Sequence, residues 1–456
     1  MVYKMVTRSS VTDGLPTMDY ADTLRHRIDT GNAVVGIIGM GYVGLPLALA
    51  FVERGFTVIG FDVDAVKVAR LSRGEGYIKH LDGGRIAAAA ATGRLQATTD
   101  FVRLSDPDAV LICVPTPLTP QREPDMTYVE HSTRQVQAAL RPGQLIVLES
   151  TTYPGTTDEL LRRILEQTGL RCGTDFFLAF SPEREDPGNK DYGTTTTPKV
   201  VGGVDAVSGD LAQALYDRII VRSVRVSSAR AAEATKLTEN IFRAVNIALV
   251  NELKIIYERM GIDVWEVLDA AATKPFGFMR FNPGPGWGGH CIPLDPFYLA
   301  WKAREYGVGP RFIELAGDVN VEMPHYVIGK LQGALNERGK AVRDSKVLVL
   351  GLAYKKDIDD PRESPAFEAI ELLLRLGARV SYHDPHIPEA PRMRSWPDLP
   401  PMRSVCLSEA ALAEQDAVVI ITDHTAVDYD LVLRCAPLIV DTRGIFRKPH
   451  PAVVKA

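Results

Sequence analysis

The sequence has few cysteines, and they lie far apart. No two of the five form a Cys-x-x-Cys pair within the 456 residues. Such spacing supports neither a disulfide framework nor a cysteine-bound zinc ion, and it is typical of a reducing cytoplasm. We therefore expect no metal site. The cysteines are Cys113, Cys172, Cys291, Cys406 and Cys435.

A strong net charge and long apolar runs are also missing. Lys and Arg number 52 against 57 Asp and Glu, a net charge of −5 without a long run of one sign. No apolar stretch reaches the roughly 18 residues of a membrane span, and the N-terminus lacks the apolar run of a signal peptide. We expect a cytoplasmic protein that binds neither nucleic acid nor membrane and holds any anionic ligand with local groups.

The length predicts two or three domains, because a typical domain has about 150 residues. The order of predicted elements indicates an α/β protein with two Rossmann-like domains, each a doubly wound parallel sheet, joined by a long central helix. The first segment is a polar leader with one short helix near Leu24 to Ile28. The predicted segments are residues 1–32, 33–227, 228–335 and 336–456.

One right-handed βαβ unit is predicted near the N-terminus. It consists of a strand at Val34–Ile38, a helix at Leu45–Glu53 and a second strand at Thr57–Phe61. Further strands of the same sheet are predicted at residues 109–114, 145–148 and 176–180.

A glycine fingerprint joins the first strand to its helix. Its first glycine permits a tight turn, the second lets a pyrophosphate approach the backbone, and the third allows close helix packing. Asp62 ends the second strand, where a carboxylate binds the adenosine ribose and repels a 2′-phosphate, so NAD is predicted rather than NADP. Lys67, one helical turn further, either approaches the cofactor or is a plain surface lysine. The fingerprint is Gly39, Met40, Gly41, Tyr42, Val43 and Gly44.

The central region predicts one long amphipathic helix, from about Ser228 to Met260. A helix of this length between two α/β halves either forms a dimer face or is a plain connector, and we expect a homodimer or an assembly of dimers. Glu233, Lys236 and Asn240 share one face, because offsets of three and seven place them within about 60° of arc. Taken alone, the row either faces a ligand or is a solvated face.

A second α/β pattern begins near Lys346. Its strands, at Val347–Gly351, Val380–Asp384 and Ala417–Thr422, repeat the order of the first pattern, but the three-glycine fingerprint is missing. The pattern predicts a degenerate Rossmann-like domain.

Cys291 lies in a loop with three glycines, Gly286, Gly288 and Gly289, followed by Pro293. The glycines let the backbone run close to a ligand, and the proline stiffens the exit. A thiol and a redox cofactor in one chain suggest oxidation through a covalent intermediate, because a thiol adds to an aldehyde and the adduct still has a hydride to give. We expect the other four cysteines to be buried and inert.

These motifs together resemble the UDP-glucose/GDP-mannose dehydrogenase family, in order and over roughly residues 33 to 446. The resemblance implies an NAD-binding Rossmann domain, a central helical dimerisation region with the cysteine loop, and a C-terminal domain that binds the nucleotide of a UDP-sugar. The motifs are the glycine fingerprint, Ser150-Thr151, Ser181-Pro182-Glu183, Glu233 to Asn240, Gly286 to Asp295, Gly351 to Lys355 and Arg362 to Pro365.

The resemblance also implies a reaction, the four-electron oxidation of a sugar C6 hydroxyl to a carboxylate. Cys291 would capture the aldehyde, and water would open the thioester that a second hydride transfer leaves. Lys236 would stabilise the oxyanions, and Asp295 with Thr151 would position the water. Glu183 would be an acid/base or sugar-contacting carboxylate.

Binding residues follow from the same resemblance. Asn240 would hydrogen-bond the hexose, Tyr354 and Lys355 would contact the UDP part, and Arg362 the NAD. Some members carry a second glutamate where this chain has Pro187, and whether Glu185 replaces it is left open. The further implied contacts are Val114, Thr116 and Thr151 for the cofactor, and Glu183, Lys236, Arg280, Phe281, Gly288 and Arg443 for the substrate.

The segments at residues 181–189 and 273–293 resemble the branch that oxidises UDP-N-acetylhexosamines, particularly UDP-N-acetyl-D-glucosamine, for surface polysaccharide synthesis. UDP-N-acetylgalactosamine or another acetamido sugar is one alternative, and UDP-glucose is the other. A β-hydroxyacid dehydrogenase would not use the cysteine loop, and a silent NAD-binding protein would have no need of it. A short-chain epimerase would need the pair Tyr298 and Lys302, which follows the cysteine loop at an unsuitable position.

Overall fold

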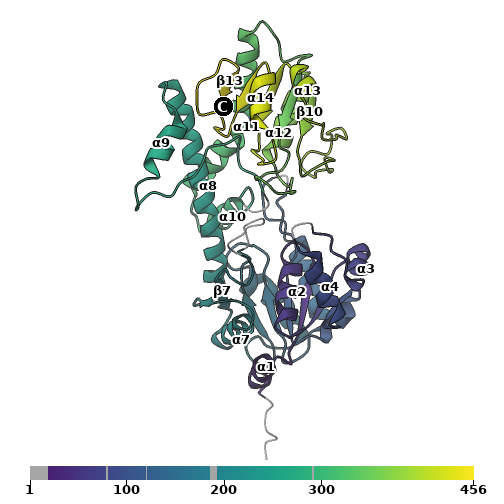
Figure 1. The fold of residues 1–456 in the computed structure, drawn as a ribbon. Coiled ribbons are helices and arrows are strands. Elements are labelled where there is room, and N and C mark those ends of the chain that lie inside the picture. Colours follow the sequence, from purple (N-terminus) through teal and green to yellow (C-terminus); the bar gives the residue numbers. More distant parts are fainter. Residues whose placement is uncertain (1–18, 79–80, 120, 185–192, 290–291) are drawn as a thin grey trace, which may run out of the picture.

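The structure is a computed structural model that describes residues 19–78, 81–119, 121–184, 193–289 and 292–456. Figure 1 shows two lobes, each containing a sheet, with a column of helices between and beside them. The long helix α8 runs from the N-terminal lobe to the C-terminal lobe.

The N-terminal lobe is built on a sheet with strand order β3-β2-β1-β4-β5-β6-β7-β8. Its pairs are parallel except β6 with β7, which is antiparallel. No helix lies between these two strands in the described residues, and an antiparallel neighbour needs no crossover helix. The strands are β1 (Val34–Ile38), β2 (Thr57–Phe61), β3 (Leu95–Thr98), β4 (Ala109–Ile112), β5 (Leu145–Leu148), β6 (Phe177–Phe180), β7 (Lys199–Gly203) and β8 (Ser223–Arg225).

Helices cover both faces of this sheet, so the central strands are apolar and buried throughout, as in other parallel sheets. Several helices begin at an aspartate whose carboxylate accepts hydrogen bonds from first-turn N–H groups, as Asp64 does for α3. The helices of the lobe are α1 (Tyr20–Asp29), α2 (Gly44–Glu53), α3 (Ala65–Ser72), α4 (Gly83–Ala91), η1 (Phe101–Ser105), α5 (Thr127–Ala139), η2 (Thr156–Leu161), α6 (Arg162–Leu165), η3 (Glu166–Thr168) and α7 (Ala206–Asp217).

The central region contains α8 (Ala229–Arg259), which is capped by the Ser228 side chain and agrees with the predicted long helix. It also contains α9 (Val264–Ala271), α10 (Asp295–Glu305) and α11 (Arg311–Glu337). The 27-residue helix α11 packs along α8 and was not predicted. It contains Pro324, and an internal proline normally indicates a helix boundary. No helix in the described ranges is long and apolar enough to cross a membrane.

The C-terminal lobe has a parallel sheet of order β10-β9-β11-β12-β13. The predicted fold class, α/β with two Rossmann-like sheets and a long joining helix, is confirmed. The elements of this lobe are β9 (Lys346–Leu350), α12 (Pro365–Arg375), β10 (Arg379–His383), α13 (Glu409–Ala413), β11 (Ala417–Ile420), α14 (Tyr429–Cys435), β12 (Ile439–Asp441) and β13 (Val453–Lys455).

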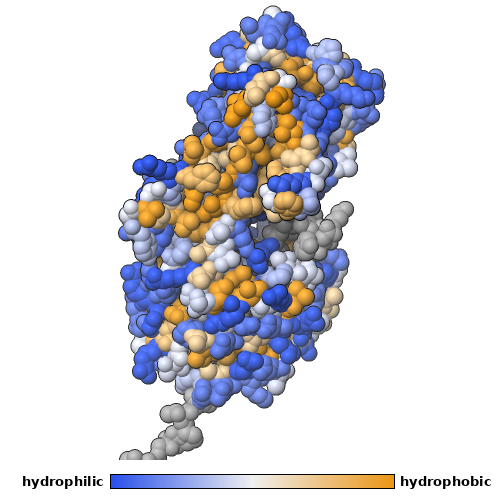
Figure 2. All heavy atoms as spheres, turned by 90° about the vertical axis from the view of Figure 1, so that its left-hand side faces the viewer, coloured by the Kyte–Doolittle hydropathy of each residue, from blue (hydrophilic) through white to orange (hydrophobic). Residues whose placement is uncertain are grey.

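One face of the central region exposes large apolar side chains, and Figure 2 shows them gathered on the side where α8 and α9 lie. Leu249 is 51% exposed and Met260 62% exposed, whereas such side chains on a monomer are usually scattered singly. We call this surface the apolar face. It is defined by Phe242, Leu249 and Ile256 of α8 and by Met260, which directly follows α8, because offsets of seven, fourteen and eighteen residues place these four on one side of the helix.

Candidate functional site

The glycine fingerprint lies at the carboxyl end of β1, where the strand order reverses between β1 and β4. Gly39 has a φ of 92°, and a Cβ there would lie 2.3 Å from the carbonyl oxygen of Cys113. A Cβ on Gly44 would lie 2.0 Å from the carbonyl oxygen of Gly39. Beside Gly41, by contrast, no described atom lies within 4 Å. A side chain would therefore clash at Gly39 and at Gly44 but not at Gly41. The backbone at Gly41 is accessible to a pyrophosphate.

Asp62 lies beside this turn. Its carboxylate accepts hydrogen bonds from the N–H groups of Met40, at 3.0 Å, and Asp64, at 2.9 Å. The Lys67 ammonium lies 3.4 Å from the same carboxylate. The acidic group is thus held at the end of β2, where the adenosine ribose of a dinucleotide would bind. Lys67 is therefore paired with the carboxylate at the end of β2.

The other wall of the crevice is formed by the ends of β4 and β5. The Ser150 hydroxyl accepts the N–H of Val114 at 2.9 Å and donates to the Val114 carbonyl at 2.7 Å. Thr151 follows directly. Thr116 is buried and hydrogen-bonds Tyr298 of α10, a contact that the sequence did not indicate. The three implied cofactor contacts in this region therefore lie on adjacent strand ends.

Arg362 reaches this crevice from the C-terminal lobe. Its guanidinium lies 4.4 Å from the ring centroid of Tyr42, in the fingerprint turn, at cation–π distance. A bidentate ion pair with Asp360 fixes its orientation. An arginine of one lobe is thus placed against the dinucleotide turn of the other.

A buried polar cluster forms beside α8. Lys236 and Asn240 are both buried, and the Lys236 ammonium donates to the backbone carbonyl of Glu183. The Asn240 amide donates to the carboxylate of Asp295, at the start of α10. The exit of β6, α8 and α10 therefore bring together four of the predicted site residues. We call these four the α8 cluster.

The charge state of Asp295 is set by its surroundings. Burial raises the pKa of Asp295 to about 6, although the Lys236 charge and the Asn240 hydrogen bond both lower it. The carboxylate is therefore ionised at neutral pH and able to take a proton.

Glu233 lies one helical turn before Lys236, but it accepts hydrogen bonds from the start of η2. Its carboxylate accepts the N–H groups of Gly155, at 2.6 Å, and Thr157, at 2.9 Å, and the Thr157 hydroxyl at 2.6 Å. It is fully buried. Glu233 therefore fastens η2, and with it the loop after Thr151, to the helix that carries the α8 cluster.

The glycine loop before α10 packs against the C-terminal lobe. A Cβ on Gly288 would lie 2.8 Å from Cβ of Tyr354, and one on Gly289 would lie 2.8 Å from the Tyr354 ring. The N–H of Gly289 donates to the Arg362 carbonyl at 3.1 Å. Four residues of the sequence argument lie outside the described residues, namely Glu185, Pro187, His290 and Cys291.

The remaining implied substrate contacts divide into two groups. The Arg443 side chain donates to the Ile421 carbonyl at 2.6 Å and lies against Gly284, at the base of the glycine loop. Arg280 pairs with Asp269 of α9 instead. Phe281 packs on Phe242 of α8, with ring centroids 5.8 Å apart. The observed contacts of Arg280 and Phe281 are therefore with the helices rather than with the α8 cluster.

A buried ion pair between Lys199 and Glu149 lies near the site, and no sequence pattern indicates it. The Lys199 ammonium lies 2.6 Å from the carboxylate of Glu149, which also accepts the Tyr216 hydroxyl. Lys199 donates to the Pro182 carbonyl at 3.1 Å as well. The pair thus links the end of β5 to the start of β7 and, through the Pro182 carbonyl, to the segment after β6. Its members are 50 residues apart, so no local pattern predicts it.

Burial disfavours the thiolate form of two of the described cysteines, Cys113 and Cys172. Cys113, Cys172 and Cys435 are partly buried, and burial raises the pKa of Cys172 to about 12 and that of Cys113 above its usual value. The expectation that Cys406 is buried is wrong, because it lies in an exposed loop before α13.

Tyr298 and Lys302, the pair that a short-chain epimerase would need, form hydrogen bonds with other groups. Tyr298 donates to the Pro117 carbonyl at 3.2 Å, and Lys302 donates to Glu159 and Glu305 at 3.0 and 2.7 Å. The two side chains are therefore not available as a catalytic Tyr–Lys pair.

Three domain models of one protein family match this chain and together cover most of it. Models of the UDP-glucose/GDP-mannose dehydrogenase family match in order, with the NAD binding domain at residues 33–220, the central domain at 230–322 and the UDP binding domain at 348–448.

Individual relatives carry several sugar names. The chain is 36% identical to a UDP-N-acetyl-D-glucosamine 6-dehydrogenase of Pseudomonas aeruginosa, over 79% of this chain and 85% of the relative. It is 35% identical to a UDP-N-acetyl-D-mannosamine dehydrogenase of Escherichia coli K12, over 91% and 99%. A solved UDP-D-ManNAc dehydrogenase of Pyrococcus horikoshii superimposes with a TM-score of 0.82 at 32% identity, covering 91% of this chain and 96% of that one.

Proposed function

This chain belongs to the UDP-glucose/GDP-mannose dehydrogenase family, and from that premise we propose that it oxidises the C6 hydroxyl of a UDP-N-acetylhexosamine to a carboxylate. The coarser activity, an NAD-dependent dehydrogenase of UDP-sugars, follows from the family itself. The observation that supports the proposal best is the α8 cluster, in which Lys236, Asn240 and Asp295 meet Glu183. An ammonium, an amide and a carboxylate with a raised pKa are the groups that this oxidation requires.

The residues of the chain have separate tasks in the proposed reaction. NAD, when bound in the crevice beside Gly41, accepts the hydride. The Lys236 ammonium stabilises negative charge on the C6 oxygen, a contribution commonly worth a few kcal/mol. Asp295 is ionised above about pH 6 and takes a proton from a water that Thr151 helps to position.

Cys291 is the proposed nucleophile. Its thiolate would add to the C6 aldehyde, and transfer of a second hydride from this adduct to a second NAD would leave a thioester. Water would then open the thioester to the carboxylate and release the thiolate. Glu183 assists as an acid/base or as a sugar contact, and Asn240 hydrogen-bonds the hexose.

The binding residues are assigned to the three parts of the chain. We assign NAD binding to residues 33–227 with Arg362, the dimer interface to 228–335, and the nucleotide of the sugar to 336–456. Tyr354, Lys355 and Arg443 are the proposed substrate contacts there, and Gly288 of the glycine loop is a further one. Arg280 and Phe281 remain proposed contacts too, although their observed neighbours are helical. The catalytic thiol needs a reducing compartment, so we place the reaction in the cytoplasm, with its uronic-acid product used for surface polysaccharide.

Two sugars are the leading candidates, and a third sugar name is carried by a Ralstonia nicotianae relative, an NDP-N-acetyl-D-galactosaminuronic acid dehydrogenase that is 34% identical over 92% of this chain. UDP-N-acetyl-D-glucosamine is the first candidate, because the P. aeruginosa relative that carries this name is 36% identical. UDP-N-acetyl-D-mannosamine, one of the other acetamido sugars that the sequence leaves open, is the second, because relatives with that name match over 91% of this chain. Both carry an acetamido group at C2 and differ only in its orientation.

A stoichiometric assay tests the reaction and the substrate together. We expect two NADH per UDP-sugar consumed, and a kcat/KM for UDP-N-acetyl-D-glucosamine at least ~100-fold above that for UDP-glucose, since a site fitted to an amide leaves polar groups unpaired with a hydroxyl. The panel also includes the mannosamine and galactosamine analogues. One NADH per sugar would refute the four-electron reaction, and a preference for UDP-glucose would refute the acetamido assignment. Cys291→Ser is expected to abolish turnover.

A further inference from the structure

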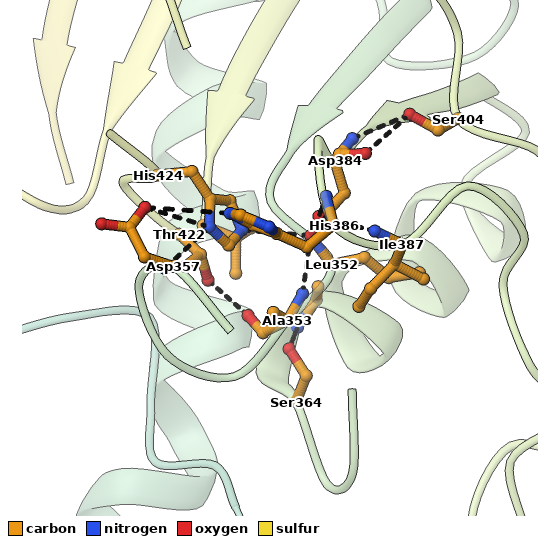
Figure 3. Close-up of polar contacts among 12 residues, drawn as sticks. Leu352, Ala353, Asp357, Ser364, Asp384, His386, Ile387, Ser404, Thr422 and His424 are labelled. Atoms are coloured by element: carbon orange, nitrogen blue, oxygen red, sulfur yellow. Dashed lines mark hydrogen bonds and ion pairs between the residues drawn. The ribbon is translucent and has the colours of Figure 1, made fainter. Parts of the chain in front are cut away.

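Two histidines and an aspartate meet at the carboxyl edge of the C-terminal sheet, apart from the α8 cluster. Asp357 follows β9, His386 follows β10 and His424 follows β11, and Figure 3 shows their side chains turned toward one another. The carboxylate oxygen of Asp357 lies 3.9 Å from Nε2 of His386 and 3.9 Å from Nδ1 of His424. One ligand-type atom from each residue lies within 4.8 Å of the other two.

His386 is the first indication that something binds there. Its Nε2 is buried and has no hydrogen-bond partner among the described residues. Buried polar atoms in native proteins nearly always have a partner, so this one indicates an atom that the protein itself does not supply. The ring of His386 stands 4.9 Å from that of His424 at an angle of 60°, so the two rings are not stacked and both edges are directed to the same space.

The proton of His424 is fixed by its second neighbour. Nε2 of His424 lies 3.1 Å from Asp384, whose carboxylate also accepts the N–H groups of Leu352 and Ala353. Nδ1 of His424 accepts the N–H of Asp357 at 3.0 Å, so Nδ1 carries a lone pair and Nε2 carries the proton that it donates to Asp384. Metal-binding histidines are commonly oriented by a carboxylate in this way.

We propose that Asp357, His386 and His424 bind a divalent transition metal, for which Zn²⁺ is the best match, with Asp384 as the orienting carboxylate. Two imidazoles and one carboxylate suit Zn²⁺ and its neighbours rather than Mg²⁺ or Ca²⁺, which prefer oxygen ligands. With three protein ligands, the fourth position is left to water.

Metal binding requires a small contraction of the two distances between Asp357 and the histidines, and the two histidine nitrogens, which lie within 4.8 Å of each other, must also approach. At zinc–ligand distances of about 2.0–2.1 Å, tetrahedral ligand atoms stand about 3.3 Å apart, so each 3.9 Å edge must shorten by roughly half an ångström. Nδ1 of His424 now accepts the Asp357 N–H at 3.0 Å, and the metal displaces that single bond. Thr425 donates its N–H and its hydroxyl to the Asp357 carboxylate, whose oxygens each keep a further lone pair.

A bound ion would join the loops after β9, β10 and β11. The first of these loops runs from Gly351 through Tyr354 and Lys355 to Asp357, so the ion would also fix the backbone that presents those two side chains. Metal binding at this site is independent of the proposed dehydrogenase reaction.

Cobalt titration of the full-length protein tests the site, because Co²⁺ replaces Zn²⁺ and absorbs visible light. We expect one Co²⁺ per chain, displaced by Zn²⁺, without the near-ultraviolet sulfur band that a cysteine site would give. His386→Gln and Asp357→Asn should each weaken binding more than about 100-fold, since even loss of an orienting partner costs 10- to 100-fold. His325→Gln, a half-exposed histidine on α11, is the matched control and should bind as the wild type does.

The melting temperature of each metal-free variant shows that the fold is kept, and Zn²⁺ should raise it in the wild type and in His325→Gln alone. The inference is overturned if the wild-type protein binds no Co²⁺, if the band carries sulfur character, or if His386→Gln binds as tightly as the control.

Discussion

At the scale of single residues, the glycines of the fingerprint turn differ in what a methyl group would meet. A Cβ on Gly44 would lie against the Gly39 carbonyl, whereas the space beside Gly41 is open and its φ is outside the left-handed region. We expect Gly44→Ala to destabilise the protein by about 3 kcal/mol. Gly41→Ala should fold normally and bind NAD roughly 10- to 100-fold more weakly, because its methyl group takes the space of the pyrophosphate.

Chemical denaturation and NAD titration measure the two effects separately. Equal loss of stability in both variants would show that the space beside Gly41 is filled in solution. Unchanged NAD affinity in Gly41→Ala would place the pyrophosphate elsewhere.

The raised pKa of Asp295 predicts a pH limit on catalysis. As the pH falls below about 6 the carboxylate takes a proton and can no longer accept one, so kcat should fall on the acid side of that value. Asn240→Ala removes a hydrogen bond that lowers the pKa of Asp295, and the acid limb should therefore move to higher pH. A pH profile of kcat measures both.

Thr238→Ala, on an exposed position of the same helix, is the control and should leave the limb in place. An acid limb that stays fixed in Asn240→Ala would mean that another group titrates.

Sites formed by residues that lie close together in the sequence were predictable. Contacts between residues that lie far apart in the sequence were not. Asp62 and the fingerprint glycines lie in one βαβ unit, so their roles follow from the sequence. The contact of Arg362 with Tyr42 and the pair of Glu149 with Lys199 join distant segments. Only the packed chain brings such groups together.

At the scale of elements, one carboxylate joins η2 to α8. Glu233 accepts three hydrogen bonds from Gly155 and Thr157, and an amide in its place would direct an NH₂ group at an N–H donor. We expect Glu233→Gln to lower the free energy of unfolding by about 1–3 kcal/mol, because a buried donor loses its acceptor.

Urea denaturation at pH 8 measures this loss. The exposed Glu252→Gln on the same helix should change it by less than about 0.5 kcal/mol. Equal stability of the two variants would show that water satisfies the η2 donors.

The elements themselves were predicted unevenly. The bounds of α8 follow from its apolar spacing and its Ser228 cap, and the first strands follow from their apolar runs. Helix α11 was missed because Pro324 interrupts its pattern, although helical packing tolerates it. The antiparallel pairing of β7 has no local signal, since strand direction depends on the path of the connecting chain.

At the scale of the whole molecule, the apolar face predicts association. Leu249 is about half exposed near its centre, and a charge there would be buried twice in a two-fold dimer. We expect Leu249→Glu to weaken the dimer at least ~100-fold and to give monomers in light scattering at micromolar concentration.

Val66→Glu is the control, because Val66 is also apolar and 68% exposed but lies on α3 of the N-terminal lobe. A wild-type protein that is monomeric, or a Leu249→Glu variant that is not, would contradict the dimer proposal.

The two Rossmann-like lobes differ in one respect that governs the timing of the proposed reaction. In the C-terminal lobe Ala353 stands where the N-terminal turn has Gly41, and the N–H groups of Leu352 and Ala353 are already bound by Asp384. Within the described residues, the chain therefore offers one dinucleotide crevice for a reaction that uses two NAD. The spent cofactor must leave and a fresh one must enter while the sugar stays. The half-oxidised sugar has to outlast that exchange, which is the physical reason for tethering it to a thiol.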